Sequence, residues 1–261
     1  MTDEIRYELD GHVARVTIDR PHVLNALDEP AQERMNALFD EIERDPRVRV
    51  VVLTGAGEKA FCVGADMSTA GVDKTGVDYW ADAQPNGFGG LALRETLDVP
   101  VIARVNGYAL GGGMEMVLGC DIIVASETAQ FGLTEPRVGR IALDGGVVRL
   151  PRQIPYHLAM GMLLTGRRMK APQAEAVGLV NEVVPAERLD EAVDGWIADI
   201  LACAPLSLRA VKHLVQNTTH MTPRQAQGQR SAALVRALRS KDSEEGVRAF
   251  QEKRPPAWKG E

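Results

Sequence analysis

The sequence has little of what metal-dependent or nucleophilic enzymes need. Its five histidines show no metal-ligand spacing with one another or with cysteine, no serine stands in a G-x-S-x-G elbow, and no P-loop occurs. Chemistry through a bound metal, an activated serine or a P-loop therefore has little support in the sequence, and we expect no metal site.

Cysteine is also scarce. The three cysteines, Cys62, Cys120 and Cys203, are odd in number, far apart and set in apolar surroundings. This pattern predicts buried free thiols in a reducing cytoplasm and does not indicate a disulfide framework.

Long apolar runs and dense basic clusters are absent too. No run approaches the roughly 20 apolar residues that span a bilayer, and the first residues, MTDEIRYELDGH, contain no apolar signal core. The formal net charge is −6, and no Lys/Arg cluster is dense enough to follow a phosphate backbone. We therefore expect a cytoplasmic protein that neither spans a membrane nor binds nucleic acid, although a local basic pocket can still take a small anion.

The 261 residues do contain strands that alternate with helices and are then followed by helices alone. Asp10-Gly11 predicts the turn of a hairpin, and Asp28 predicts the cap of a helix that runs to about Arg44. Short apolar runs predict strands at 48–53, 101–105, 122–125 and 179–184, and helices are predicted from Pro172 and over about 187–203, 206–217, 223–239 and 242–252. This order predicts an α/β core with a helical C-terminal part.

Residues 68–90 are rich in turn formers, with Tyr79, Trp80 and Phe88 scattered among them. That composition predicts a mobile loop or a short irregular helix. Loops of this kind often shape substrate pockets.

The segment VVLTGAGEKA is the first candidate for chemistry. Gly55, Gly57 and Ala60 fit the loose dinucleotide fingerprint G-x-G-x-x-A after a strand. That fingerprint requires a helix to start at once, whereas FCVGADMSTAG follows here with weak helical periodicity. We therefore interpret the glycines as a tight turn after a strand and set a nicotinamide-dependent oxidoreductase aside.

The stretch VNGYALGGGMEMVLGCD combines three glycines, Gly111–Gly113, with one acid, Glu115, at the start of an apolar run. N–H groups at a helix N-terminus are unpaired, and glycines there let a substrate oxygen approach them, as in an oxyanion hole. Close packing of the helix against a neighbour also requires small residues. An acid among apolar residues is costly unless it is paired or used, but the local sequence by itself favours an exposed partner of the helix dipole.

Two further segments are candidates for the same site. In AFCVGADM, the small residues Gly64 and Ala65 follow a strand and either expose a backbone N–H to a ligand or form an ordinary turn. In QFGLTEPRVG, Glu135 lies in a loop, where a lone acid is normally exposed to solvent. Paired with Glu115 in one site, it would complete an acid and a base with different pKa values.

The segments AFCVGADM, VNGYALGGGMEM, GCDIIVAS, AQFGLTEPRVG and GGVVRLPR together resemble the crotonase (enoyl-CoA hydratase/isomerase) superfamily in order and spacing. LTGRRMKAPQAEAVGLVNEVV and the closing AFQEKRPPAWKG are also similar, so the resemblance covers essentially the whole chain. The GRRM segment and the closing Trp-Lys-Gly resemble the carnitinyl-CoA dehydratase branch in particular. The resemblance implies a crotonase-like (ClpP/crotonase) α/β fold, a spiral of ββα units. It further implies a catalytic core at residues 1–195 and a helical oligomerisation region at 196–261.

The resemblance also implies an acyl-CoA hydro-lyase. The backbone N–H groups of Ala65 and Gly112 would form an oxyanion hole for the thioester carbonyl. Glu115 would help to deprotonate a water that attacks the β-carbon of a 2-enoyl-CoA, and Glu135 would deliver a proton to the α-carbon. Coenzyme A enters as part of the substrate, so we expect no separate cofactor.

Further contacts follow from the same resemblance. Substrate or CoA contacts are implied for His22, Val23, Leu24, Gly64, Asp66, Met67, Gly111, Leu143, Phe250 and Lys253. Among them, Phe250 and Lys253 match positions that reach the CoA of a neighbouring subunit. The C-terminal helices would assemble a homotrimer, often paired into a hexamer.

One segment departs from the family pattern. Many hydratases have Pro-Gly at the positions of Ala142 and Leu143, and a leucine there would narrow or reshape the acyl pocket. We interpret the following Asp144 as a helix cap before Gly145-Gly146, with a catalytic role as the alternative.

Because of this departure at Ala142 and Leu143, two other activities remain alternatives to a hydratase. One is an isomerase that shifts a double bond between C3 and C2, and the other is a carnitinyl-CoA dehydratase-like hydro-lyase. A non-catalytic CoA-binding assembly protein is the alternative outside the enzymes. A substituted glutamate would favour it, but both Glu115 and Glu135 are present.

Overall fold

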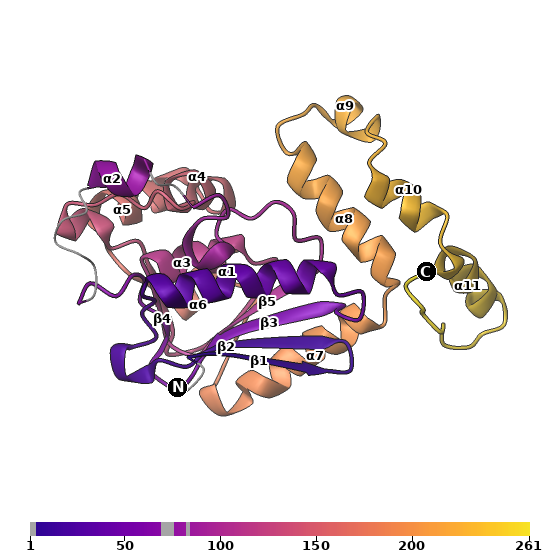
Figure 1. The fold of residues 1–261 in the computed structure, drawn as a ribbon, viewed down its shortest axis with the longest axis horizontal. Helices are drawn as coiled ribbons and strands as arrows, with labels where there is room; N and C mark the ends of the chain where they lie inside the picture. The colour runs from indigo at the N-terminus through magenta and orange to yellow at the C-terminus, as the bar shows by residue number, and fades with distance from the viewer. Residues whose placement is uncertain (1–3, 69–75, 82–83) are drawn as a thin grey trace.

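Two β-sheets organise the chain, whose computed structural model describes residues 4–68, 76–81 and 84–261 (Figure 1). The larger sheet has the order β1 (Ile5–Asp10), β2 (Val13–Ile18), β3 (Val50–Gly55), β5 (Val101–Val105), β7 (Ile122–Ser126) and β10 (Glu182–Val184). The smaller sheet has the order β4 (Ala60–Cys62), β6 (Tyr108–Leu110), β8 (Gln130–Gly132) and β9 (Met169–Lys170). Strands β1 and β9 run antiparallel to their neighbours, and the other neighbouring strands are parallel.

From β3 to β8, consecutive strands alternate between the two sheets. β3, β5 and β7 belong to the larger sheet, and each is followed by a short strand of the smaller sheet, β4, β6 or β8. After β6 the chain enters α3 (Gly112–Gly119). This alternation confirms the predicted spiral of ββα units.

The predicted N-terminal elements are confirmed. Gly11, with φ +54°, forms the hairpin turn between β1 and β2. Helix α1 (Glu29–Arg44) starts where Asp28 accepts a hydrogen bond from the Ala31 N–H, which satisfies one of the unpaired donors of its first turn.

Helices cover both faces of the larger sheet (Figure 1). The apolar side chains of α1 join the main core, whose members on this helix are Ala31, Met35, Leu38, Phe39 and Ile42. On the opposite face, α7 (Leu189–Leu201) packs its buried residues against Val50, Val52, Ile102 and Val124. Because its strands are apolar on both faces, the sheet is buried between these two layers.

The last helices form an arm beside the core (Figure 1). It contains α8 (Pro205–Thr218), α9 (Pro223–Gln227), α10 (Ala232–Leu238) and α11 (Lys241–Gln251). The stretch predicted as one element over 223–239 is two helices, because Gly228 ends α9 and Ser231 caps α10. The predicted domain boundary between residues 195 and 196 falls inside α7, all of which lies on the sheet.

The sequence did not indicate the four strands of the smaller sheet or the single-turn helices η1 to η4. Helix α2 (Gly76–Ala81) agrees with the short helix that was one alternative for residues 68–90. Helix α4 (Gly146–Gln153) starts where a helix was expected after Gly145, and α5 (Tyr156–Thr165) follows it. In the predicted loop at 68–90 the structure places α2 and η2 (Phe88–Gly90), while residues 69–75 and 82–83 lie outside the described residues. The Gly55-Gly57 turn leads into β4 and not into a helix, which confirms that the dinucleotide fingerprint does not apply.

All three cysteines are free thiols, as predicted, but they are not all buried. Cys62 is buried, Cys120 is partly buried and Cys203 is exposed, because α7 ends just before it. None of the helices in the described part of the chain has both the length and the apolar character that a membrane crossing requires.

Candidate active site

Three parallel strands of the smaller sheet end at one edge and carry the candidate site. β4, β6 and β8 lie side by side, with Cys62 paired to Ala109 and Leu110 paired to Gly132. Ala65 follows β4, Gly112 follows β6 and Glu135 follows β8. Because parallel strands end at the same edge, the sheet brings these three distant residues together.

Glycine is required where the first two strand ends meet. Gly64 has φ +97°, and a Cβ on it would lie 3.1 Å from the Gly112 N and 3.3 Å from the Leu110 O. A Cβ on Gly113 would lie only 2.1 Å from the carbonyl oxygen of Cys62. The turn after β4 and the N-terminus of α3 are therefore in backbone contact, which larger residues would prevent.

Two backbone donors are available at this junction. A parallel bridge pairs Leu27 with Ala65 through the Gly64 carbonyl and the Asp66 N–H, and this pairing does not use the Ala65 N–H. Gly112 is the first residue of α3, so its N–H has no acceptor within the helix. Among the described residues, neither N–H donates a hydrogen bond. Two unpaired donors in adjacent turns are what an oxyanion hole requires.

Glu115 lies in the first turn of α3 and is only 3% exposed. Its Oε1 accepts a hydrogen bond of 2.9 Å from the Gly146 N–H. Burial raises the pKa of Glu115 to about 8, and the nearby charges of Asp144 and Glu135 add to the effect of burial. The exposed position that the local sequence favoured is therefore wrong, and this acid can hold a proton at neutral pH.

Glu135 begins the 3-10 helix η3 (Glu135–Val138), and two residues separate it from the end of β8. Its Oε1 lies beside Gly111, where an added Cβ would be 3.3 Å away. Its Oε2 is buried and has no hydrogen-bond partner among the described residues. Burial raises the pKa of Glu135, and the charge of Asp144 acts in the same direction. A buried carboxylate oxygen without a partner is costly, but it is available to a reacting molecule.

Asp144 adds a third carboxylate, 8% exposed, at the same place. It accepts a hydrogen bond from the Tyr79 hydroxyl of α2, and burial raises its pKa. Its predicted role as a helix cap is wrong, because α4 begins at Gly146 after Gly145 as the N-cap and no side chain caps it. Within the described residues, no lysine, arginine or histidine forms an ion pair with Glu115, Glu135 or Asp144.

Two of the implied CoA contacts, Met67 and Leu143, lie close in sequence to residues of the site, and three others lie together in a separate turn. His22 and Val23 belong to η1 (Pro21–Val23), and Leu24, with φ +56°, ends it. Met67, 63% exposed, follows the turn that contains Ala65. Leu143, 36% exposed, directly precedes Asp144.

The remaining implied contacts are Asp66, Phe250 and Lys253. Asp66 directly follows Ala65 and is buried, and its carboxylate accepts hydrogen bonds from the Arg20 guanidinium and from Ser68. Phe250, 85% exposed, and Lys253 lie on the C-terminal arm, remote from α3 of the same chain (Figure 1). Within one chain, the structure therefore does not bring these two residues to the site.

Two residues that support the junction had no signal in the local sequence. The ring of Phe88 packs on Gly112, where a Cβ would be 2.5 Å from the Phe88 Cγ. The buried side chain of Arg20 holds Asp66, which directly follows Ala65. An isolated arginine before a proline and an aromatic residue in a turn-rich segment do not by themselves indicate such contacts.

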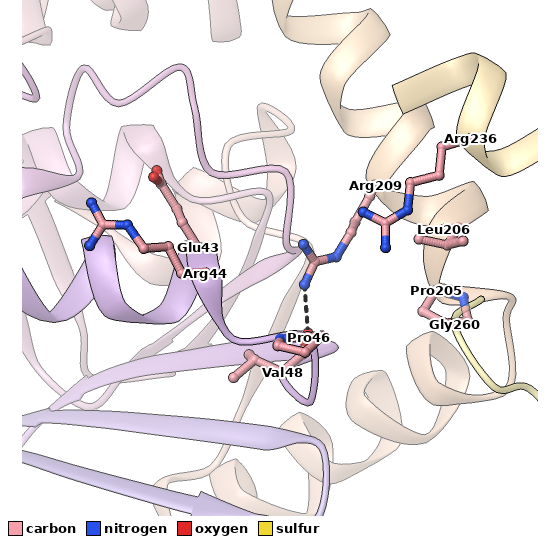
Figure 2. Close-up of a pocket in the computed structure, with 9 residues that line it drawn as sticks. All are labelled: Glu43, Arg44, Pro46, Val48, Pro205, Leu206, Arg209, Arg236 and Gly260. Carbon is pink, nitrogen blue, oxygen red and sulfur yellow. Dashed lines mark hydrogen bonds between the residues drawn. The ribbon is translucent and has the colours of Figure 1, made fainter. Parts of the chain in front are cut away.

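No cluster of metal-ligand type occurs in the parts of the chain that are described. A cavity of about 110 Å³ lies where the end of α1 and the start of β3 meet α8 and α10 (Figure 2). Arg209 in its wall donates a hydrogen bond of 3.0 Å to the Val48 carbonyl. The residues that line the cavity include none of the predicted site residues.

Comparison with known proteins agrees with this geometry. Residues 8–261 match the family described as enoyl-CoA hydratase/isomerase. The chain is 39% identical to the carnitinyl-CoA dehydratase of Citrobacter koseri and 38% identical to that of Escherichia coli K12, with full coverage of both chains in each case. The crystal structure of an enoyl-CoA hydratase from Bacillus anthracis superposes with a TM-score of 0.91 at 35% identity, covering 99% of this chain and 100% of the other. An enoyl-CoA hydratase from Mycobacterium tuberculosis superposes with a TM-score of 0.88 at 32% identity, covering 99% of each chain.

Proposed function

The chain belongs to the enoyl-CoA hydratase/isomerase family, and from this premise we propose that it is a hydro-lyase that adds water to a 2-enoyl-CoA or removes it. The observation that carries the proposal is the meeting of the buried Glu115 and the half-buried Glu135 with the two unpaired backbone donors of Ala65 and Gly112. An isomerase needs only one acid to move a proton between two carbons, whereas water addition needs a base and an acid.

The backbone donors would stabilise the charge of the reacting thioester. The carbonyl oxygen accepts hydrogen bonds from the N–H groups of Ala65 and Gly112 and gains negative charge as an enolate-like state forms. Donors fixed at this position before the reaction act most strongly on that charge, and loss of one costs about 3 kcal/mol in other enzymes. The helix N-terminus at Gly112 adds a partial positive charge.

The two acids would exchange one water and one proton with the substrate. In the hydration direction, ionised Glu115 takes a proton from water while the water oxygen bonds to the β-carbon. Protonated Glu135 gives a proton to the α-carbon. In the reverse direction, Glu135 removes the α-proton, and Glu115 gives a proton to the leaving hydroxyl. A pKa of about 8 for Glu115 favours the protonation state that starts water removal.

The mechanism predicts that both acids are essential for hydration. We expect Glu115→Gln and Glu135→Gln each to lower kcat by on the order of 10²–10⁴. The reason is that glutamine keeps the shape of the glutamate side chain but cannot carry out its proton transfer. The measurement is turnover of a panel of 2-enoyl-CoA and 3-enoyl-CoA thioesters, followed by the ultraviolet absorbance of the conjugated thioester. Full hydratase activity in either variant would refute the two-acid mechanism. Conversion of 3-enoyl substrates alone, with no hydration of any acyl chain, would identify an isomerase.

A carnitinyl-CoA dehydratase-like activity is the second candidate. The observation in its favour is that relatives at 38–39% identity over the full chain carry this name. The same acids and donors would serve it, because removal of a β-hydroxyl is the reverse of water addition. Carnitinyl-CoA should therefore be included in the panel, and its kcat/KM compared with that of straight-chain 3-hydroxyacyl-CoA thioesters.

A further inference from the structure

Arg20 is an arginine with an unusual degree of burial for its charge. It is 4% exposed and lies just after β2, and its guanidinium donates to three carboxylates. These are Glu4 at 2.9 Å, Asp66 at 3.1 Å and Asp28. Its Nη1 and Nη2 make these ion pairs, whereas its buried Nε has no hydrogen-bond partner among the described residues. Three carboxylates around one buried cation define the position of its guanidinium.

Two of the three carboxylates hold the strand bridge behind the candidate oxyanion hole. Asp28 follows Leu27, Asp66 follows Ala65, and Leu27 pairs with Ala65. The bridge consists of two hydrogen bonds of 2.9 Å, from the Leu27 N–H to the Gly64 carbonyl and from the Asp66 N–H to the Leu27 carbonyl. One guanidinium therefore ties together the residues that follow both members of the bridge.

This bridge sets the direction of the Ala65 N–H. Because the Gly64 carbonyl and the Asp66 N–H both point toward Leu27, strand alternation turns the N–H of Ala65 to the opposite side. The same turn lies against the N-terminus of α3, since a Cβ on Gly64 would lie 3.1 Å from the Gly112 N. A shift of Asp66 would therefore rotate one candidate donor relative to the other.

The surroundings favour the charged forms of Asp28 and Asp66. Hydrogen bonds from Ser68 and the charge of Arg20 lower the pKa of Asp66. For Asp28, hydrogen bonds from Arg20 and the Ala31 N–H outweigh burial, and its pKa is also lowered. A lysine at position 20 would keep one positive charge but would lack the planar fork that reaches several carboxylates at once.

We propose that Arg20 is a positioning residue that aligns the Ala65 N–H for the thioester carbonyl, through its ion pairs with Asp28 and Asp66. The inference rests on the proposed function, because it assigns Ala65 as an oxyanion donor. Arg20 itself does not touch the reacting atoms. It fixes the backbone on the side of the turn that faces away from the substrate.

The test compares Arg20→Lys with wild type by two readouts. Polarisation of the carbonyl is measured as the red shift in ultraviolet absorbance when a conjugated, slowly reacting 2,4-dienoyl-CoA binds. We expect Arg20→Lys to lower this shift and to lower kcat by about ten- to a hundredfold, with KM changed by less than about threefold. Lys212→Met is the matched control, because it removes another buried cation, paired with Asp121, and should leave the red shift unchanged.

The outcomes separate the inference from the proposed function. A normal red shift and normal kcat in Arg20→Lys would overturn the positioning role, and so would an equal loss of red shift in Lys212→Met. If wild type itself gives neither a red shift nor hydration, the proposed function fails first. Should Arg20→Lys not fold, Asp66→Asn removes the same link at its other end and is expected to lower the red shift likewise.

Discussion

At the scale of single residues, the local sequence around Glu115 favours an exposed side chain, whereas the fold buries it. As the fourth residue of α3, it would suit an exposed acid near the positive end of the helix. The helix instead packs against the core and against the start of α4, which buries the carboxylate and binds it through the Gly146 N–H. Only the tertiary fold supplies this information, because Gly146 and Asp144 lie about 30 residues further along the chain.

The raised pKa of Glu115 predicts how water removal depends on pH. Water removal needs Glu115 protonated, and its pKa of about 8 lies above the ordinary value, so the competent form is present below pH 8 and is lost above it. We expect kcat/KM for dehydration of a 3-hydroxyacyl-CoA to fall as pH rises through about 8, and to fall again at low pH as Glu135 takes up a proton. A pH–rate profile checks this, and a rate that keeps rising through pH 9 would contradict it.

At the scale of elements, the length of a helix or strand determined whether the sequence could identify it. The hairpin, α1, β3, β5, β7 and the C-terminal helices are long enough for periodicity and caps to identify them. The strands β4, β6 and β8 have three residues each, too few for alternation to show, yet their shared edge assembles the site. Local patterns therefore indicated glycines and acids of interest, and only the whole-chain resemblance placed them in one site.

The contact of α3 with β4 predicts opposite effects for two helical glycines. Gly113→Ala should destabilise the protein by several kcal/mol, because its Cβ would lie 2.1 Å from the Cys62 carbonyl and backbone must move. Gly195→Ala in α7 meets nothing within 4 Å and should be neutral or stabilise by up to about 1 kcal/mol through helix propensity. Thermal unfolding of both variants measures this. Equal melting temperatures would show that the close approach of α3 and β4 is not required.

At the scale of the whole molecule, the C-terminal arm leaves several large apolar side chains exposed. They are Val211, Val215, Leu238, Val247 and Phe250, and other exposed apolar residues, such as Ile141 and Leu164, lie outside the arm. Apolar surface of this extent on helices usually marks an interface. The predicted trimer or hexamer would cover it, and it would bring Phe250 and Lys253 to a neighbouring subunit.

This surface predicts a change of mass in solution. We expect wild type to have three or six times the 28.3 kDa mass of the chain, and Val215→Asp together with Phe250→Asp to shift the protein toward smaller species. The cause is the cost of burying a charge in an apolar interface. Light scattering after size-exclusion chromatography measures the mass, and Val77→Asp, at an exposed valine of α2, is the control. A monomeric wild type would contradict the oligomer prediction.

The central claim is that Glu115 and Glu135 add water across the double bond of a 2-enoyl-CoA. The most direct measurement is mass spectrometry of the product formed from a 2-enoyl-CoA in water labelled with heavy oxygen. The account predicts a 3-hydroxyacyl-CoA that contains the label with wild type and almost none with Glu115→Gln or Glu135→Gln. An unlabelled 3-enoyl product from wild type, or labelled product at the wild-type rate from either variant, would contradict it.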